Sequence, residues 1–244
     1  DKGPVTVKDI TEELEKYQGT PMTAFVLKAH ESEVFLDFLP YLRGFGVEPF
    51  DEKGMPLFNC EKGIRALNRY RYLLDYTSDK SIEFGNNEVR EEIQQDRCYM
   101  GLTWGGQLAA VMDEQCESPE SWSFTYPEKP WNVTWSFGIN SKSLNKELAM
   151  EVLMELTDKK VDRKVGIICG NPTRDSNFLL DETRFRWYKY AKEMILASYP
   201  LANFPQLPDS IGVITEEIRS VLVGNKTPEE ALRTAEDKVK LLHI

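Results

Sequence analysis

The stretch DRCYMGLTWGGQ, residues 96–107, contains the clearest passage from strand to helix in this 244-residue sequence. An apolar run at 98–103 has the length of a buried strand, and Trp104 and two glycines follow it directly. A helical pattern then continues over 107–115. This order predicts a short strand whose C-terminal end is marked by a tryptophan and two glycines.

Two further strands are expected, at 21–28 upstream and at 133–139 downstream of this stretch. The rest of the chain is mostly helical, with apolar residues at helical spacing. The last helix has a clear start, with Thr227 as its cap, Pro228 at its first position and Glu230 at its third. The other predicted helices are 6–18 (capped by Thr6), 33–43, 59–75 (capped by Asn59), 86–93, 145–157 and 179–198.

The composition is that of an ordinary globular protein. The sequence has 41% hydrophobic and 29% charged residues, which excludes a disordered chain and a membrane-spanning one. There are 30 Lys and Arg against 40 Asp and Glu, so the formal net charge is −10. Because an acidic surface repels phosphate backbones, no nucleic-acid partner is expected. We expect the one basic aromatic run, RFRWYKY at 184–190, to pack as a helix instead.

No motif for nucleophilic, metal or cofactor chemistry is present. The sequence has no glycine-rich phosphate loop, no G-x-S-x-G and no H-E-x-x-H pattern. It has only two histidines, and its four cysteines match no zinc spacing, so neither a metal site nor a cofactor is expected. The cysteines are compatible with up to two disulfides or with free thiols. We therefore predict no catalytic residues and a protein that is not an enzyme.

Tryptophans gather at the end of the predicted strand and around the proline-rich stretch 117–131. Trp104 ends the strand, and Trp122, Trp131 and Trp135 lie in or just after the proline-rich stretch. Tryptophan rings on such loops suit a platform on which the C–H face of a sugar ring stacks, while carboxylates and amides bind its hydroxyls. The alternative is that each ring packs in the core or between domains.

Six segments follow one another in a characteristic order. They are PVTVKDI (4–10), NCEKGIRALNRYRYLLD (59–75), DRCYMGLTWGGQ (96–107), WSFGINSKSLNKELAMEVLMELT (135–157), GNPTR (170–174) and GNKTPEEALRTAEDKV (224–239). Together they resemble the extracellular solute-binding proteins of ABC-type sugar importers (family 1), to which the maltodextrin-binding protein belongs. In the third segment Met100 and Trp104 match the family's strand motif.

The resemblance implies an α/β fold of the type II periplasmic-binding-protein kind. The chain would be an N-terminally truncated fragment, mainly the second, C-terminal lobe with a mixed sheet flanked by helices, plus a segment of the first lobe. The implied parts are residues 1–130 and 176–244 for the second lobe and 131–175 for the crossover and first-lobe segment. Apolar surface around 131–175 would then be left uncovered.

The implied function is to bind a sugar or oligosaccharide in a cleft between lobes and deliver it to the membrane permease of an ABC importer. Such a protein works outside the cytoplasm, as a periplasmic protein or a membrane-anchored lipoprotein, and we expect a monomer. Two alternatives stay open: the same fold binding another small solute, such as glycerol phosphate, a polyamine or an amino acid, or a carbohydrate-active enzyme.

Candidate ligand-binding residues follow from the resemblance by position. Trp104 matches a stacking tryptophan, Gly105 would let the ring approach it, and Arg174 is expected at a hinge. Ile211 stands where maltodextrin binders have an aromatic residue, which argues against a long maltodextrin bound in the same way. The full predicted set is His30, Glu31, Glu33, Phe35, Trp104, Gly105, Gln107, Trp135 and Asp209.

Overall fold

Two short parallel strands, β1 (Thr23–Val26) and β2 (Cys98–Gly101), lie at the centre of the molecule. A computed structural model describes residues 3–20, 23–133 and 135–244. Thr23 pairs with Cys98 and Val26 with Gly101. A Cβ atom at Gly101 would lie 2.8 Å from Val26 Cγ2, so glycine at this position allows the strands to approach.

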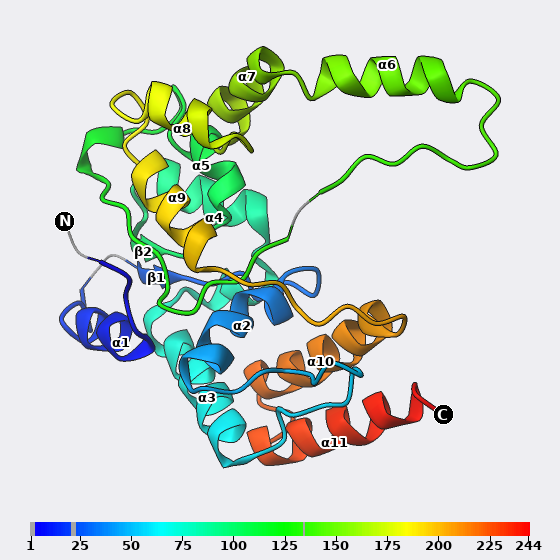
Figure 1. The fold of residues 1–244 in the computed structure, drawn as a ribbon. Helices are drawn as coiled ribbons and strands as arrows, with labels where there is room; N and C mark the ends of the chain where they lie inside the picture. The colour runs from blue at the N-terminus through cyan, green and yellow to red at the C-terminus, as the bar shows by residue number, and fades with distance from the viewer. Residues whose placement is uncertain (1–2, 21–22, 134) are drawn as a thin grey trace.

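Helices on one side of the strands enclose the main hydrophobic core (Figure 1). Nearly all of α2 is buried, and Phe35 and Phe38 from this helix pack beside Leu67 and Tyr70 from α3. The antiparallel pair α10 and α11 packs against α2 and α3. The elements on this side are α1 (Val7–Glu15), α2 (Val34–Gly44), α3 (Glu61–Tyr72), η1 (Leu73–Tyr76), η2 (Asp79–Glu83), α10 (Leu207–Leu222) and α11 (Pro228–Leu241).

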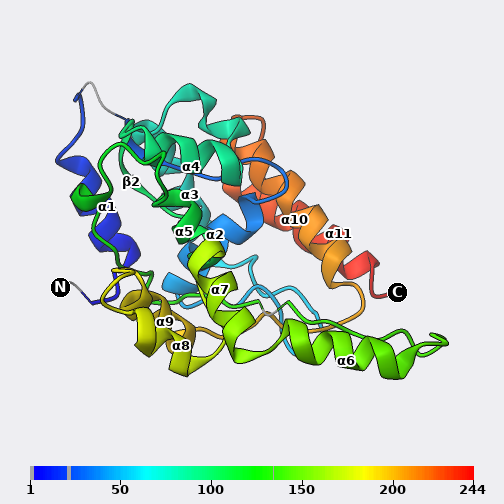
Figure 2. The same ribbon diagram turned by 90° about the horizontal axis from the view of Figure 1, so that it is seen from above.

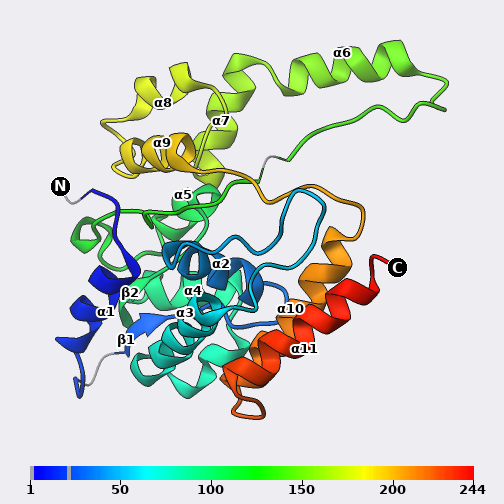
Figure 3. The ribbon, with the colours of Figure 1, turned by 60° about the horizontal axis from the view of Figure 1, so that its bottom comes forward.

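Shorter helices form a second group on the other side of the strands (Figures 1 and 3). An aromatic cluster lies there, and Ala109 from α5 packs against it. Its aromatic members are Phe178, Phe185, Trp187 and Tyr188. The elements of this side are α4 (Asn86–Gln94), η3 (Gly105–Gln107), α5 (Leu108–Val111), η4 (Pro119–Ser121), α7 (Lys159–Cys169), α8 (Asp175–Asp181) and α9 (Tyr188–Ala197).

The segment that leads to α6 (Lys146–Leu156) extends away from both groups (Figures 1 and 2). No residue of α6 is buried, although the helix has apolar side chains such as Leu148 and Met154. Trp135, in the extended segment before it, is 92% exposed. The uncovered apolar surface that the sequence predicts around 131–175 is therefore present over residues 135–156.

The caps predicted at Thr6 and Thr227 form. Thr6 accepts a hydrogen bond from the Asp9 amide at 3.0 Å, and Asp9 accepts from the Thr6 amide at 2.8 Å. Thr227 and Glu230 make the same reciprocal pair at the start of α11. The predicted strand at 21–28 is β1, shortened to Thr23–Val26, with residues 21 and 22 outside the described part.

Two predicted elements are wrong. The strand at 133–139 does not form over its described residues, because no neighbouring strand lies beside this segment to complete a ladder. The helix at 179–198 is broken between α8 and α9, where Phe185 and Trp187 turn into the aromatic cluster.

Three further predictions need correction. The helix at 107–115 ends at Val111, because Asp113 instead accepts hydrogen bonds from Gln94 and from the Gln115 amide. Asn59 does not cap α3; its amide binds Glu236 on α11. The sheet is not mixed within the described residues, since both of its strands are parallel.

Residues 3–20, 23–133 and 135–244 contain no membrane-spanning helix, no metal site and no disulfide. No helix there is both long and apolar enough to cross a membrane. No group of His, Cys, Asp and Glu in the same residues has the geometry to hold a metal ion. All four cysteines are free thiols in the structure, which decides between the two states that the sequence left open.

The contrast between α3 and α6 gives a test of the fold. Leu67 is fully buried in α3, whereas Leu148 in α6 is 59% exposed. We expect Leu67→Ala to lower the free energy of unfolding by about 2–5 kcal/mol and Leu148→Ala by less than about 0.5 kcal/mol. Urea denaturation of the two variants measures both values. A similar loss in the two variants would mean that the apolar side of α6 is covered.

Candidate functional site

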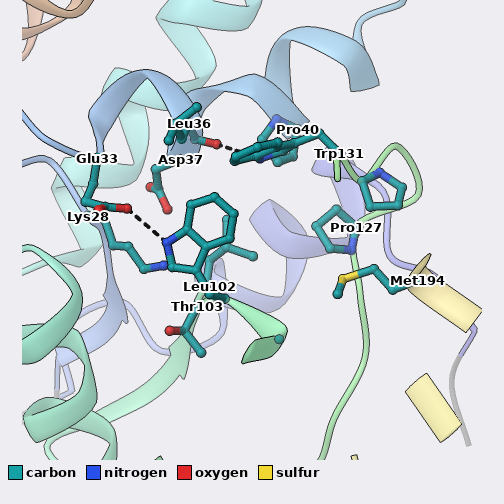
Figure 4. Close-up of a pocket in the computed structure, with 13 residues that line it drawn as sticks. Lys28, Glu33, Leu36, Asp37, Pro40, Leu102, Thr103, Pro127, Trp131 and Met194 are labelled. Carbon is teal, nitrogen blue, oxygen red and sulfur yellow. Dashed lines mark hydrogen bonds between the residues drawn. The ribbon is translucent and has the colours of Figure 1, made fainter. Parts of the chain in front are cut away.

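A recess opens at the C-terminal ends of β1 and β2 (Figure 4). Its walls are the start of α2, the segment 102–105 that leaves β2, and the loop 127–131. Its free volume is about 70 Å³, which is enough for a few water molecules. A ligand the size of a sugar ring would therefore lie across the recess and not inside it.

Two tryptophans form an aromatic corner at the recess. The ring centroids of Trp104 and Trp131 are 4.6 Å apart, and their planes meet at 78°. The Trp131 indole Nε1 donates to the Leu36 carbonyl at 3.1 Å, and the Trp104 Nε1 donates to the Glu33 carboxylate at 3.0 Å. Both rings are therefore held in fixed orientations by hydrogen bonds to α2 and to the residue that precedes it (Figure 4).

Glu33 links the aromatic corner to the helices around it. It occupies the N-cap position of α2, but its side chain does not cap the helix. One carboxylate oxygen accepts from Trp104 and the other accepts from the Asn86 side chain at 2.8 Å. Both oxygens of Glu33 are thus already bonded, and the carboxylate serves mainly to position the Trp104 ring.

A buried pair of oppositely charged residues lines the recess together with Trp104. Lys28 and Asp37 are only 4% and 5% exposed, and both line the recess. The Tyr70 hydroxyl donates to Asp37 at 2.8 Å, and the Lys28 ammonium lies 5.2 Å from the centroid of the Trp104 ring. These residues come from the segment after β1, from α2, from α3 and from the segment after β2.

Burial controls the charge state of this pair. Desolvation raises the pKa of Asp37 to about 6, although Lys28 and the Tyr70 hydrogen bond partly oppose the rise. Desolvation lowers the pKa of Lys28 to about 8, partly opposed by Asp37 and Glu33. At neutral pH the recess therefore contains one cation beside two carboxylates.

Comparison with known proteins assigns this architecture to a family. Residues 8–162 match the model for bacterial extracellular solute-binding proteins. The chain belongs to this family. Members of this family are solute-binding proteins and not enzymes, and the family description places them outside the cytoplasm.

Solved structures with the same architecture confirm the α/β periplasmic-binding-protein fold of this solute-binding protein. Maltose-bound MalE3 of T. maritima matches 99% of the chain with a TM-score of 0.88 and 19% identity. The ribitol complex of a solute-binding protein from Agrobacterium radiobacter K84 matches 99% with a TM-score of 0.84 and 19% identity. The chain spans 66% and 65% of the lengths of these two proteins.

One curated relative is described with a different specificity. The protein y4oP of Sinorhizobium fredii, described as a probable amino-acid ABC transporter periplasmic-binding protein, is 22% identical over 253 residues. The match includes 98% of this chain and 57% of y4oP. The chain therefore resembles proteins that are described with different solutes.

Three of the predicted site residues meet at the recess of this solute-binding protein. Glu33, Trp104 and Gly105 all line it. A Cβ atom on Gly105 would lie 2.7 Å from the Asn171 side-chain nitrogen and 3.1 Å from Met194. Glycine there is needed for the close approach of the GNPTR turn and α9, in addition to any contact with a ligand.

The other predicted residues lie elsewhere. Phe35 belongs to the hydrophobic core, because it follows Glu33 by two positions and so faces the opposite side of α2. His30 and Glu31 line a different hollow, beside α10. Gln107 accepts a hydrogen bond from Thr103 at 3.1 Å and does not line the recess.

Trp135, Asp209 and Arg174 are also away from the recess. Trp135 lies in the exposed segment before α6, and Asp209 is exposed in the first turn of α10. The Arg174 guanidinium donates to the Thr157 carbonyl, which ties the GNPTR turn to the end of α6. Within this chain, none of the three residues lines the recess.

Sequence reasoning missed Lys28 and Asp37 and left Trp131 out of the predicted site. One signal was available: Asp37 is a lone charge inside the apolar run VFLDFLP, four residues after Glu33 and therefore on the same side of the helix. Lys28 follows the apolar strand as its first charged residue. Neither signal says that the two charges lie together.

The raised pKa of Asp37 predicts a pH dependence of stability. Folding favours the neutral carboxyl, so the contribution of Asp37 to stability is greatest below about pH 4 and falls as the pH rises through about 6. This difference is on the order of 3 kcal/mol. Asp37→Asn removes the titration and keeps the shape of the side chain.

The measurement is the free energy of unfolding of wild type and Asp37→Asn at pH 4.5 and pH 7.5. Other carboxylates titrate equally in both proteins, so their effect cancels in the comparison. We expect Asp37→Asn to gain stability relative to wild type as the pH rises. Parallel pH profiles would contradict the raised pKa.

Proposed function

We propose that this protein binds a neutral sugar or polyol at the recess and belongs to an ABC importer. The observation on which the proposal rests is the Trp104–Trp131 corner beside Lys28, Glu33 and Asp37. Flat ring faces attract the C–H face of a sugar, and nearby charged groups form hydrogen bonds with its hydroxyls. An aromatic wall with a few polar groups on one side suits a polyhydroxylated ligand.

The relatives support this ligand class without deciding it. The two structures described above contain maltose and ribitol, a disaccharide and a polyol, in proteins of the same fold. By analogy the ligand would lie between two lobes, and closure of the lobes would present it to the permease subunits. The protein would act as a monomer, in the periplasm or as a membrane-anchored lipoprotein.

The similarity to y4oP, a probable amino-acid-binding protein, favours an amino acid as a second candidate. Lys28 could bind the α-carboxylate of an amino acid, and Asp37 could bind its ammonium group. Other solutes fit less well. Phosphate requires several cationic donors, and Lys28 is the only one among the described residues that line the recess.

Ligand titration followed by NMR tests the proposed class. The indole Nε1–H signals of Trp104 and Trp131 report directly on the recess, and the method detects weak binding. We expect maltose or ribitol to shift these signals and glycine or glutamate to leave them unchanged. Shifts with amino acids alone would replace the proposed function by the second candidate.

Two variants locate the binding surface. Trp104→Ala removes one wall of the corner and should weaken sugar binding tenfold or more, since loss of an aromatic wall removes about 1.5 kcal/mol or more. Trp122→Ala is the matched control, because Trp122 binds Asp96 and lies outside the recess. Equal affinity in both variants would remove the aromatic corner from the site.

A further inference from the structure

Lys28 is an unusual residue because its side chain is buried while its ammonium group has no hydrogen-bond partner among the described residues. The residue is 4% exposed, and no hydrogen bond or ion pair joins its ammonium to any residue of the described part of the chain. An ammonium group has three donors, and Lys28 Nζ is not among the fully buried unsatisfied atoms of the described residues, so these donors face the open recess. The ammonium lies near the Trp104 ring and at the wall of the recess (Figure 4).

The neighbouring carboxylates accept hydrogen bonds from other donors and none from this ammonium group. Both Glu33 oxygens accept from side chains, namely Trp104 and Asn86. Asp37 accepts from the Tyr70 hydroxyl at 2.8 Å. The recess therefore presents unused N–H donors of Lys28, close to carboxylates that can each accept one more bond.

We infer that Lys28 is a specificity-determining ligand contact, which donates to a hydroxyl oxygen of a neutral polyhydroxylated ligand stacked on Trp104. A hydroxyl can accept from Lys28 and at the same time donate its own proton to Asp37. This inference rests on the proposed function and adds one contact to it: Lys28 binds a hydroxyl of the ligand whose ring stacks on Trp104.

Charge distinguishes a hydroxyl from an acidic group here. The single cation of Lys28 faces the carboxylates of Glu33 and Asp37, so the recess has a net negative charge at neutral pH. A ligand carboxylate or phosphate would be repelled by this charge and could not donate to Asp37. A neutral polyol avoids the repulsion and fills both hydrogen-bonding roles.

The inference predicts a pH dependence that a purely structural lysine would not produce. The groups that face Lys28 are Glu33 and Asp37, with Tyr70 behind Asp37 from α3. Burial raises the pKa of Tyr70 far above its usual range, and the pKa of Asp37 is about 6, so neither titrates between pH 7 and 9. The segment 102–105, loop 127–131 and α9 contribute no titratable side chain to the described lining.

The protonation state of Lys28 therefore sets the affinity for the sugar between pH 7 and pH 9. Its pKa is about 8, so the charged donor is present at pH 7 and largely lost at pH 9. A charge-assisted hydrogen bond is about twice as strong as a neutral one. We expect the Kd for maltose or ribitol to rise by roughly three- to tenfold from pH 7 to pH 9.

The test uses the 244-residue chain, with maltose and ribitol as probes and Kd measured by NMR titration. Lys28→Met keeps the length of the side chain and removes the donor; its affinity at pH 7 should fall tenfold or more and should no longer depend on pH. Lys142→Met is the matched control, since Lys142 is exposed and far from the recess in sequence and structure. The wild-type pH profile remains informative if Lys28→Met does not fold.

Each outcome has one meaning. Weaker binding at pH 9 in wild type and in Lys142→Met, with a flat profile in Lys28→Met, supports the contact. Sugar binding that is independent of both pH and Lys28 would overturn this inference and leave the proposed function intact. Failure of wild type to bind either sugar at pH 7, with binding of an amino acid instead, would overturn both.

Discussion

The parallel pairing of β1 with β2 determines where the site is. Because both strands run in the same direction, the segments that leave their C-terminal ends emerge at one edge of the sheet. Lys28 comes two residues after β1, and Trp104 comes three residues after β2. Ligand sites in α/β proteins commonly lie at this edge, and the fold here brings a buried cation under an aromatic ring.

Local pattern was enough to predict the parts of the structure that depend on neighbours in sequence. The capped helices starting after Thr6 and Thr227 and the strand that ends before Trp104 all formed. The strand predicted at 133–139 does not form over its described residues, because a strand requires a neighbouring strand, and a single sequence does not show one. Similarly, α6 has the spacing of a helix and forms one, but buries none of its residues.

The site was harder to predict than the fold for the same reason. Trp104 and Glu33 were found by position, whereas Asp37 acquires its meaning only from Tyr70, which is 33 residues away. Phe35, two residues from Glu33, was assigned to the site although the turn of the helix directs it into the core. Burial and long-range contact, not residue type, distinguish these side chains.

The central claim is that Lys28, Asp37 and the Trp104–Trp131 corner bind the solute together. A crystal structure of the protein with bound maltose or ribitol tests it most directly. The account predicts a sugar C–H face against Trp104 and a hydroxyl oxygen within about 3.2 Å of both Lys28 Nζ and an Asp37 oxygen. A sugar bound elsewhere, with this recess filled only by water, would contradict it.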